Sequence, residues 1–297
     1  MNVAEFKAHR RTVATDHGEI SYVEAGEGPV ALFVHGVFLN AFLWRPVISQ
    51  LIAERRCLAI ELPAHGGTQL EPGHDFSLPT QAEVIEGFCR ALDIEPVDLV
   101  ANDTGGAVAQ VFAARWPERV RTLTLTNCDA HDNLPPAAFY DGRDAAARGE
   151  LAPLIKAIST DYALARGEQG GFGVGFEHPD RLTDEEIAEF VARTATEEGA
   201  REAEQFVNDL DAADLLAVEP RLKALEVPTL IVWGTGDVFF ETAWAEWLRD
   251  TIPGAEEIVL LEGGKLFFPY ERADEFVPHL RRHWAEHAAV APLEDRA

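Results

Sequence analysis

The chain has 297 residues, and 25 Lys and Arg residues against 51 Asp and Glu residues give a formal net charge of −26. With 47% hydrophobic and 26% charged residues, the composition is that of a globular protein of one or two domains with a large core. The acidic excess argues against binding to nucleic acid or to an anionic membrane surface, because few cations are present to neutralise phosphates. It predicts solubility and mutual repulsion between copies.

The cysteines and the apolar runs indicate in which cellular compartment the protein is expected. Cys57, Cys89 and Cys128 include no Cys-x-x-Cys pair, so neither a zinc site nor a disulfide framework is expected. Residues 1–20 contain no apolar stretch typical of a secretory signal, and runs such as residues 30–34 are too short to span a bilayer. A cytoplasmic location is the default expectation.

In the first half of the chain, short apolar runs alternate with stretches of helical periodicity. Gly26 and Gly28 predict a hairpin between the first two strands, and Thr80 is the expected N-cap of the first helix. Continuous apolar strands separated by helices indicate a parallel sheet covered on both faces. Strands are predicted over residues 19–24, 29–35, 57–62, 97–101 and 120–126, and helices over residues 79–92 and 105–116.

The pattern changes after the fifth strand. Residues 130–216 show no convincing strand, but they contain Ala-rich helical stretches and a capping box at residues 183–186. Strand signals return at residues 227–233 and 257–261, with helices near residues 242–250 and 273–287. We therefore predict an α/β core formed by residues 1–129 and 217–297, interrupted by a helical cap at residues 130–216.

Residues 99–107 read Leu-Val-Ala-Asn-Asp-Thr-Gly-Gly-Ala, in which a predicted strand leads through Asp103 into a predicted helix. This spacing is typical of a nucleophile elbow, with Asp where Ser often stands. The turn strains the backbone of its central residue, and Gly105 and Gly106 let the helix and strand approach each other. The carboxylate is expected to project above the sheet at a helix N-terminus, whose dipole favours an anion. The backbone N–H of Thr104 would then be an oxyanion donor.

With this motif the chain resembles the α/β-hydrolase superfamily, and within it the Asp-nucleophile branch of haloalkane dehalogenases and epoxide hydrolases. The resemblance covers about residues 30–276 and implies an α/β-hydrolase fold, a mostly parallel sheet flanked by helices with an inserted helical lid. Four further segments resemble the family: the His-Gly loop at residues 34–37, the loop at residues 61–68, the helix exit at residues 115–120 and the segment at residues 233–237.

The resemblance implies roles for the matching positions. Asp103 would attack carbon and form an ester, and the N–H groups of Val37 and Thr104 would form the oxyanion hole. Asp237 would be the catalytic acid that orients a His, and this His would activate the water that hydrolyses the ester.

Lys265 stands where the family has that His. Two nearby carboxylates would keep its ammonium protonated, so it could not take a proton from water. The simplest interpretation is a buried charge constellation of Asp103, Lys265 and Asp237. This arrangement puts the family's hydrolytic second half-reaction into question.

Two further differences from the family concern the residues that stabilise the leaving group. Haloalkane dehalogenases hold the halide with a Trp after the nucleophile and an Asn or similar donor after His-Gly, where this chain has Thr104 and Val37. A halide would therefore lack its stabilising donors. Epoxide hydrolases use two lid tyrosines as acids, and the predicted cap contains Tyr140 and Tyr162.

Other side chains are candidates for the substrate pocket. Phe38 and Trp44 follow the oxyanion loop and are expected in the pocket wall or the core. Asp129 follows a predicted strand where some relatives carry their acid, and His131 is a remote backup base. Hydrogen bonding between loop and lid is the more ordinary role for both.

Simpler interpretations remain open at several positions. Asp103 could be a helix N-cap, Asp237 a turn residue, and Lys265 a solvent-facing residue. His279, His283 and His287 have a spacing that could hold a metal, but an exposed face of a terminal helix is favoured, so no metal site is predicted.

The combined hypothesis is an enzyme, a hydrolase of the dehalogenase and epoxide-hydrolase group, acting on a small, mostly apolar epoxide, halide or ester through Asp103. The first alternative is a lyase or isomerase that moves protons with Asp103 and Lys265. The second is a non-catalytic ligand-binding protein on the same fold. A monomer or homodimer without a cofactor is expected.

Overall fold

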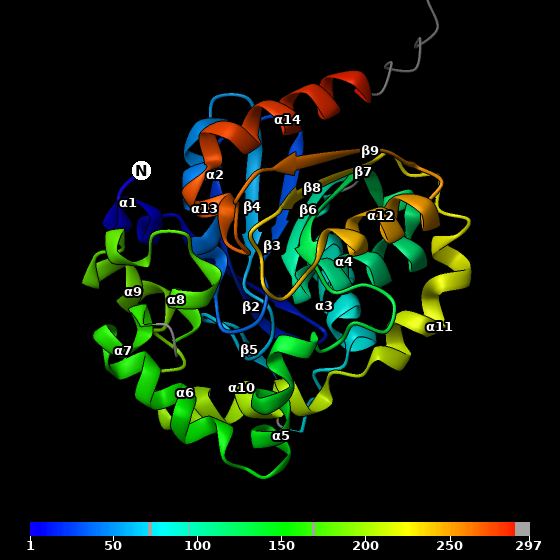
Figure 1. Cartoon of the computed structure of the whole chain (residues 1–297). Coiled ribbons are helices and arrows are strands. Elements are labelled where there is room, and N and C mark those ends of the chain that lie inside the picture. Colours follow the sequence, from blue (N-terminus) through cyan, green and yellow to red (C-terminus); the bar gives the residue numbers. More distant parts are fainter. Residues whose placement is uncertain (71–72, 95, 168–169, 289–297) are drawn as a thin grey trace, which may run out of the picture.

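A single mixed β-sheet organises the molecule (Figure 1). The computed structural model describes residues 1–70, 73–94, 96–167 and 170–288. Within this part of the chain the sheet order is β1-β2-β4-β3-β6-β7-β8-β9, and β5 pairs with β2. The strands are β1 (Arg10–Thr15), β2 (Gly18–Ala25), β3 (Val30–Val34), β4 (Arg56–Ile60), β5 (Gln69–Leu70), β6 (Val97–Asp103), β7 (Val120–Cys128), β8 (Thr229–Gly234) and β9 (Ala255–Leu261).

From β4 to β9 the neighbouring strands are parallel, as the apolar runs predict, whereas β1, β2 and β5 form antiparallel pairs. The expected hairpin between β2 and β3 is wrong, because β4 lies between these two strands. Gly26 and Gly28, at φ 82° and 113°, instead let the chain pass closely over residues 52–55. A Cβ at Gly26 would lie 2.2 Å from the backbone oxygen of Arg55.

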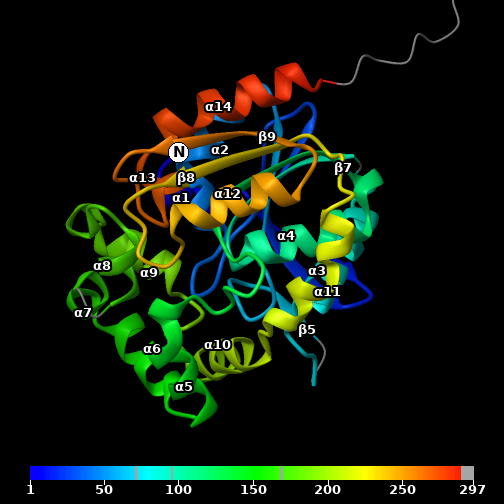
Figure 2. The same cartoon turned by 45° about the vertical axis from the view of Figure 1, so that its right-hand side comes forward.

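Helices cover both faces of the sheet (Figures 1 and 2). On one face α2 (Arg45–Leu51) packs against α13 (Phe268–Glu271) and α14 (Ala273–Glu286), and on the other α4 (Thr104–Arg115) packs against α3 (Leu78–Ala91) and α11 (Ala212–Leu222). Helix α12 (Thr242–Thr251) lies against β8 and β9, and α1 (Val3–Ala8) precedes β1. None of the described helices is long and apolar enough to cross a membrane.

The N-cap of α3 differs from the expected one. Ser77 caps this helix, and its side chain accepts the N–H of Thr80. Pro79 fits within the first turn because that turn leaves its N–H groups without intrahelical partners. The helix can therefore begin before the proline rather than at Thr80.

Helices alone form the segment between β7 and β8 in the described residues, as expected from the sequence. Thr183 and Glu186 form the predicted capping box. Helix α11 packs against α4 and α3, so the expected boundary at residue 216 falls inside a core helix. The cap helices are α5 (Tyr140–Ala147), α6 (Leu151–Thr160), α7 (Tyr162–Arg166), α8 (Gly171–Gly175), α9 (Asp184–Phe190) and α10 (Glu197–Asp209).

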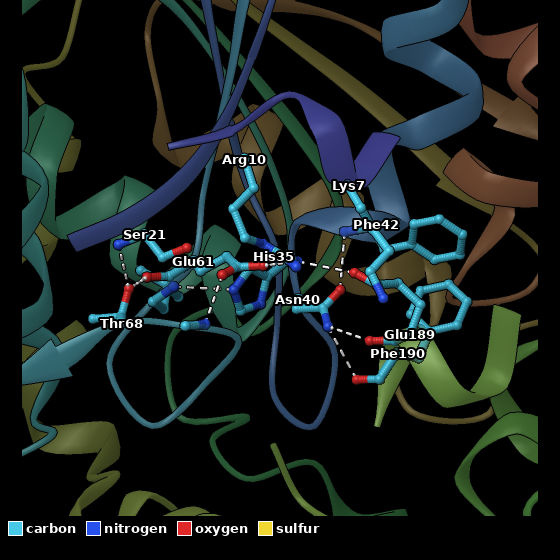
Figure 3. A network of polar contacts seen from close by, with 12 residues as sticks. Lys7, Arg10, Ser21, His35, Asn40, Phe42, Glu61, Thr68, Glu189 and Phe190 are labelled. Atoms are coloured by element: carbon cyan, nitrogen blue, oxygen red, sulfur yellow. Dashed lines mark hydrogen bonds and ion pairs between the residues drawn. The ribbon is translucent and has the colours of Figure 1, made fainter. Parts of the chain in front are cut away.

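A buried polar network ties α9 to the core (Figure 3). Arg10 Nη2 donates to Glu61 Oε1 at 2.7 Å and to Glu189 Oε1 at 3.0 Å, and neither carboxylate side chain is more than 4% exposed. Asn40 Nδ2 donates to the backbone oxygens of Glu189 and Phe190 at 2.8 and 3.1 Å. The cap is thus fixed to the sheet through β1 and through the loop after β3.

Candidate active site

Asp103 lies at the turn between β6 and α4 with φ 57° and ψ −138°, a strained conformation for a residue with a side chain. The glycines around it make the turn possible. A Cβ at Gly105 would lie 2.2 Å from the backbone oxygen of His35, and one at Gly106 would lie 2.3 Å from Cys128 Cβ. The elbow geometry predicted from residues 99–107 is therefore present.

The carboxylate of Asp103 rests on the loop that follows β3. Its Oδ2 accepts the Val37 N–H at 3.0 Å. A Cβ at Gly36 would lie 2.1 Å from this same oxygen, so the carboxylate occupies space that a side chain at that position would fill. The N–H of Val37, the expected oxyanion donor, thus contacts Asp103, and Thr104, the other expected donor, is the first residue of α4.

Two buried histidines brace these loops. The Nε2 atom of His35 accepts the N–H of Leu62 at 3.0 Å, and Nε2 of His65 accepts the N–H of Phe38 at 3.0 Å. Burial lowers the pKa of His35 to about 4 and that of His65 to about 3, so both rings are neutral at neutral pH. Their role is to hold the loop carrying Val37.

Several carboxyl groups cluster at the carboxyl ends of β6, β7 and β8. Burial, followed by the charge of Asp237, raises the pKa of Asp103 to about 7, while the N–H groups of Val37 and Thr104 oppose this rise. Burial and then the charge of Asp103 raise the pKa of Asp129 well above its usual value. At neutral pH, Asp103 can therefore exist in both its protonated and its ionised form.

Asp237 lies in the turn after β8, where Asn127 holds it. Asn127 Nδ2 donates to Asp237 Oδ2 at 2.7 Å, and the Phe239 N–H donates to Asp237 Oδ1 at 2.9 Å. Burial raises the pKa of Asp237 to about 6, although these donors oppose the rise. This carboxylate is bound to backbone and amide donors rather than to a basic side chain.

Lys265 is half-buried in the loop after β9, but its ammonium forms no ion pair or side-chain hydrogen bond with any residue that the structure describes. The expected charge constellation of Asp103, Lys265 and Asp237 is therefore not formed. Asn102 instead fixes this loop, because its Nδ2 donates to the backbone oxygen of Leu266 at 3.0 Å.

An apolar cavity of about 420 Å³ lies in front of Asp103, between the core and the cap. Asp103, Thr104, Val37, Phe38 and Asp129 all border it. The remaining wall is mostly aliphatic and aromatic and includes residues of the cap such as Leu151, Leu154, Ile155, Ile158, Phe172 and Val207.

Four other residues expected at the pocket do not line this cavity. Trp44 is fully buried in the core and packs against Phe33, with ring centroids 5.3 Å apart. His131 Nδ1 contacts Glu219 Oε2 at 2.9 Å, and its ring lies 5.0 Å from that of Trp247. The indole of Trp44 packs against the apolar side chains of β3. His131 has a φ of 54°, and the turn at this residue leads its side chain to Glu219 of α11.

The two cap tyrosines are also placed elsewhere. Tyr140 is 46% exposed and lies under the guanidinium of Arg143 at 4.5 Å. Tyr162 is half-buried at the start of α7 and packs on the edge of the main core. Neither tyrosine is among the described residues that line the cavity in front of Asp103.

Sequence reasoning missed Asn102 and Asn127 as organisers of the site. Both are fully buried polar residues near the ends of central strands, and this position is the signal that could have identified them. No group of three or more potential metal ligands occurs in the described part of the chain. At the end of α14, the rings of His283 and His287 meet edge-on, with centroids 4.9 Å apart.

Comparison with known proteins identifies the family of this chain. The model of the "alpha/beta hydrolase fold" family matches residues 29–272. The chain belongs to the α/β hydrolases. This assignment agrees with the sheet order, the elbow at Asp103 and the helical segment between β7 and β8.

Individual relatives of this α/β hydrolase differ in chemistry. It is 25% identical to a cis-3-alkyl-4-alkyloxetan-2-one decarboxylase of Shewanella oneidensis over 96% of this chain and 91% of that protein. It is 40% identical to a haloalkane dehalogenase of Mesorhizobium japonicum over 36% of this chain and 34% of that protein. The structure of a haloalkane dehalogenase from Bradyrhizobium elkani superposes with a TM-score of 0.79 at 23% identity, covering 95% of this chain and 99% of that chain.

Proposed function

We propose that this α/β hydrolase is an enzyme in which Asp103 attacks an electrophilic carbon of a small, mostly apolar molecule and forms an ester with it. The observation that carries this proposal is the strained Asp103, whose carboxylate is fixed by the Val37 N–H at 3.0 Å and borders an apolar cavity. Strain of this kind persists where the surrounding structure requires it, and it clusters at active sites.

The cavity supports an uncharged substrate with alkyl or aryl groups. Its wall is largely aliphatic and aromatic, and the hydrophobic effect favours apolar groups in such a space. The relatives agree with this class, since they are named for a haloalkane and for an oxetan-2-one with two alkyl groups. Attack by the Asp103 carboxylate displaces the halide from a haloalkane and gives an alkyl ester, whereas attack on a strained oxygen ring breaks a ring C–O bond and gives an ester that retains the released oxygen.

The proposal gives the first chemical step to Asp103 and does not need Lys265. The Lys265 ammonium has no described partner among the carboxylates and does not border the cavity. In this proposal Asp237 acts only through its negative charge, which raises the pKa of Asp103.

Intact-mass measurement tests this function directly. The protein is incubated with 1-bromohexane or with 1,2-epoxyhexane, and peptide mapping locates any adduct. We expect an alkyl ester on Asp103 that is absent from Asp103→Asn, while Asp141→Asn, altered at the exposed rim of the cavity, still forms it. If the wild-type protein forms no adduct and turns over neither compound, the proposal is wrong.

A second candidate function is proton transfer without an ester, as in a lyase or isomerase. The pKa of Asp103, raised to about 7, favours it, because a group that titrates near neutral pH exchanges protons effectively. In that case Asp103→Asn would abolish turnover of the true substrate, and no covalent species would accumulate in the wild-type protein.

A further inference from the structure

Helix α6 contributes one of its faces to the wall of the cavity. The residues of this helix that border the cavity are Leu151, Leu154, Ile155, Ile158 and Ser159. They recur at spacings of three and four residues, as residues on one face of a helix do, so their side chains point to the same side. Four of them are aliphatic, whereas Ser159 places a hydroxyl group on this otherwise apolar face.

A second hydroxyl group lies beside Ser159. Thr194, in the turn that follows α9, also borders the cavity. The Oγ atom of Ser159 and the Oγ1 atom of Thr194 are 2.8 Å apart, and the two residues are buried, with 3% and 5% of their surfaces exposed. Thr194 Oγ1 also donates to the carbonyl oxygen of Val191 at 3.2 Å. We call Ser159 and Thr194 the hydroxyl pair.

The hydroxyl pair has a hydrogen-bonding capacity that its own contacts do not fill. Each hydroxyl group has one proton to donate and two lone pairs that accept. Since Thr194 gives its proton to Val191, the proton between the two hydroxyl groups comes from Ser159. No further hydrogen bond joins the Ser159 side chain to a residue that the structure describes, so its oxygen can accept from a donor in the cavity.

The polar side chains of the described cavity wall are divided between the core and the cap. Asp103, Thr104 and Asp129 lie on the core side, at the ends of β6 and β7, and Asp141 is exposed at the rim. The hydroxyl pair belongs to the cap, where both views place α6 (Figures 1 and 2). The other described residues of the wall carry no polar side-chain group. A molecule bound between core and cap therefore meets the nucleophile on one wall and a neutral acceptor on another.

We propose that the hydroxyl pair is a binding subsite for a hydroxyl group of the substrate, with Ser159 as the acceptor and Thr194 as the residue that orients it. The substrate is then a mostly apolar alcohol, whose hydroxyl group lies some carbons away from the carbon that Asp103 attacks. The inference rests on the proposed function of Asp103 as the nucleophile. It goes further, because it names a second functional group of the substrate and the residues that recognise it.

The surroundings of the hydroxyl pair determine which donor it selects. A hydroxyl group that enters an apolar cavity without a partner loses its hydrogen bonds to water, and the pair offsets this loss at one place. An ammonium group would lose far more on burial, and the uncharged pair could not compensate for it. Because the fold fixes the distance from Ser159 to Asp103, we expect the site to favour one separation between the hydroxyl group and the reacting carbon.

Two matched series of alkylating probes test the subsite. Ester formation on Asp103 is followed by intact mass with ω-bromoalkan-1-ols of several chain lengths and with the 1-bromoalkanes of the same lengths. At each length, the ratio of the half-saturating concentrations of bromoalkane and bromoalkanol measures the preference for the hydroxyl group. We expect this preference to be greatest at one length and to fall there by about fivefold in Ser159→Ala, the effect of one net hydrogen bond between neutral groups.

The matched control is Thr160→Ala. Thr160 is the next residue of α6, but it is exposed, and its Oγ1 donates to the carbonyl oxygen of Lys156 at 2.8 Å. Its removal takes a hydroxyl group from the same helix outside the cavity wall. We expect Thr160→Ala to show the wild-type preference at every chain length.

A binding measurement separates the subsite from the function of Asp103. Asp103→Asn, which lacks the nucleophilic carboxylate, is titrated calorimetrically with the same bromoalkanols, with and without Ser159→Ala. If the wild-type protein forms no ester with any probe but Ser159→Ala weakens this binding by about fivefold, the function of Asp103 is wrong and the subsite stands. If Ser159→Ala changes both probe series alike, or leaves both the preference and the binding of the bromoalkanols unchanged, the subsite is overturned.

Discussion

The side-chain amide of Asn127 joins Asp237 to the strand beside it: its Nδ2 lies 2.7 Å from Asp237 Oδ2 and 3.1 Å from the carbonyl oxygen of Gly234. Its Oδ1 accepts the Gly234 N–H at 2.7 Å. One fully buried side chain therefore satisfies three polar groups and links the end of β7 to the turn after β8. Asp237 owes its position to this link.

Removing this amide should destabilise the fold. In Asn127→Ala, buried groups of Gly234 and Asp237 lose partners, so we expect the free energy of unfolding to fall by about 2–3 kcal/mol. Urea denaturation measures this change. Asn208→Ala, which removes a single bond of 3.2 Å in the cap, is the matched control and should cost about 1 kcal/mol or less. Similar losses in the two variants would contradict the assigned role.

A methyl group at position 36 should disable Asp103 specifically. In Gly36→Ala the new Cβ would lie 2.1 Å from Asp103 Oδ2, so the carboxylate must leave the Val37 N–H. We expect alkylation of Asp103 by 1-bromohexane to slow by about 100-fold or more, in line with displacement of a reacting group by about 1 Å. Gly87→Ala, in α3, meets no atom closer than 3.3 Å and should react as the wild-type protein does. Normal alkylation in the Gly36 variant would refute the geometry.

The stability of the protein should depend on pH through Asp103. Its pKa rises from an unfolded value near 3.8 to about 7 on folding, so the folded state binds more protons than the unfolded state between these pH values. The contribution of this group to stability is therefore present below about pH 4 and is lost as the pH rises through about 7. Asp103→Asn should be more stable than wild type at pH 8, by roughly 4 kcal/mol, and nearly equal to it at pH 4.

Denaturation of both proteins at several pH values checks this difference. Asp141→Asn, at an exposed position, should show the wild-type dependence. A constant difference between wild type and Asp103→Asn across the range would show that the carboxyl group does not titrate as stated.

The network around Arg10 should hold the cap in place. Arg10→Met would leave Glu61 and Glu189 buried without the guanidinium between them, and loss of one partner from a buried ion pair typically costs 3–5 kcal/mol. Because Arg10 is partly exposed, we expect about 3 kcal/mol and faster amide hydrogen exchange in α9. Arg148→Met removes an exposed pair with Glu150 and should change stability by less than about 0.5 kcal/mol. Unchanged exchange in α9 would rule out the anchoring role.

Sequence patterns predicted the structure correctly where residues close together in the sequence determine it. The apolar strands, the elbow at Asp103 and the Thr183–Glu186 capping box depend on nearby residues, and the structure confirms these elements. The N-terminal strand β1 was missed because it lies at the sheet edge, with half-buried and exposed residues instead of an apolar run. The hairpin error has a related cause, since glycine spacing cannot reveal that β4 inserts between two consecutive strands.

Side-chain direction was less predictable than backbone position. Lys265 lies in the loop where the family pattern places it, but its ammonium has no described partner there. Trp44, His131, Tyr140 and Tyr162 were chosen by nearness in sequence to the loop or by membership of the cap, and neither criterion fixes which way a ring points. Asp129 was identified as a strand-end carboxyl, but its burial beside Asp103 is visible only in three dimensions.

The carboxyl groups that border the cavity also act as an electrostatic filter. No cationic side chain belongs to the described wall, so an anion entering this space meets like charge at Asp103 and Asp141 without compensation. Fatty acids and organic phosphates of suitable size should be rejected for this reason alone, and any acidic product would be expelled instead of accumulating as an inhibitor. Selectivity against negatively charged molecules is therefore a property of the carboxyl groups in the cavity wall.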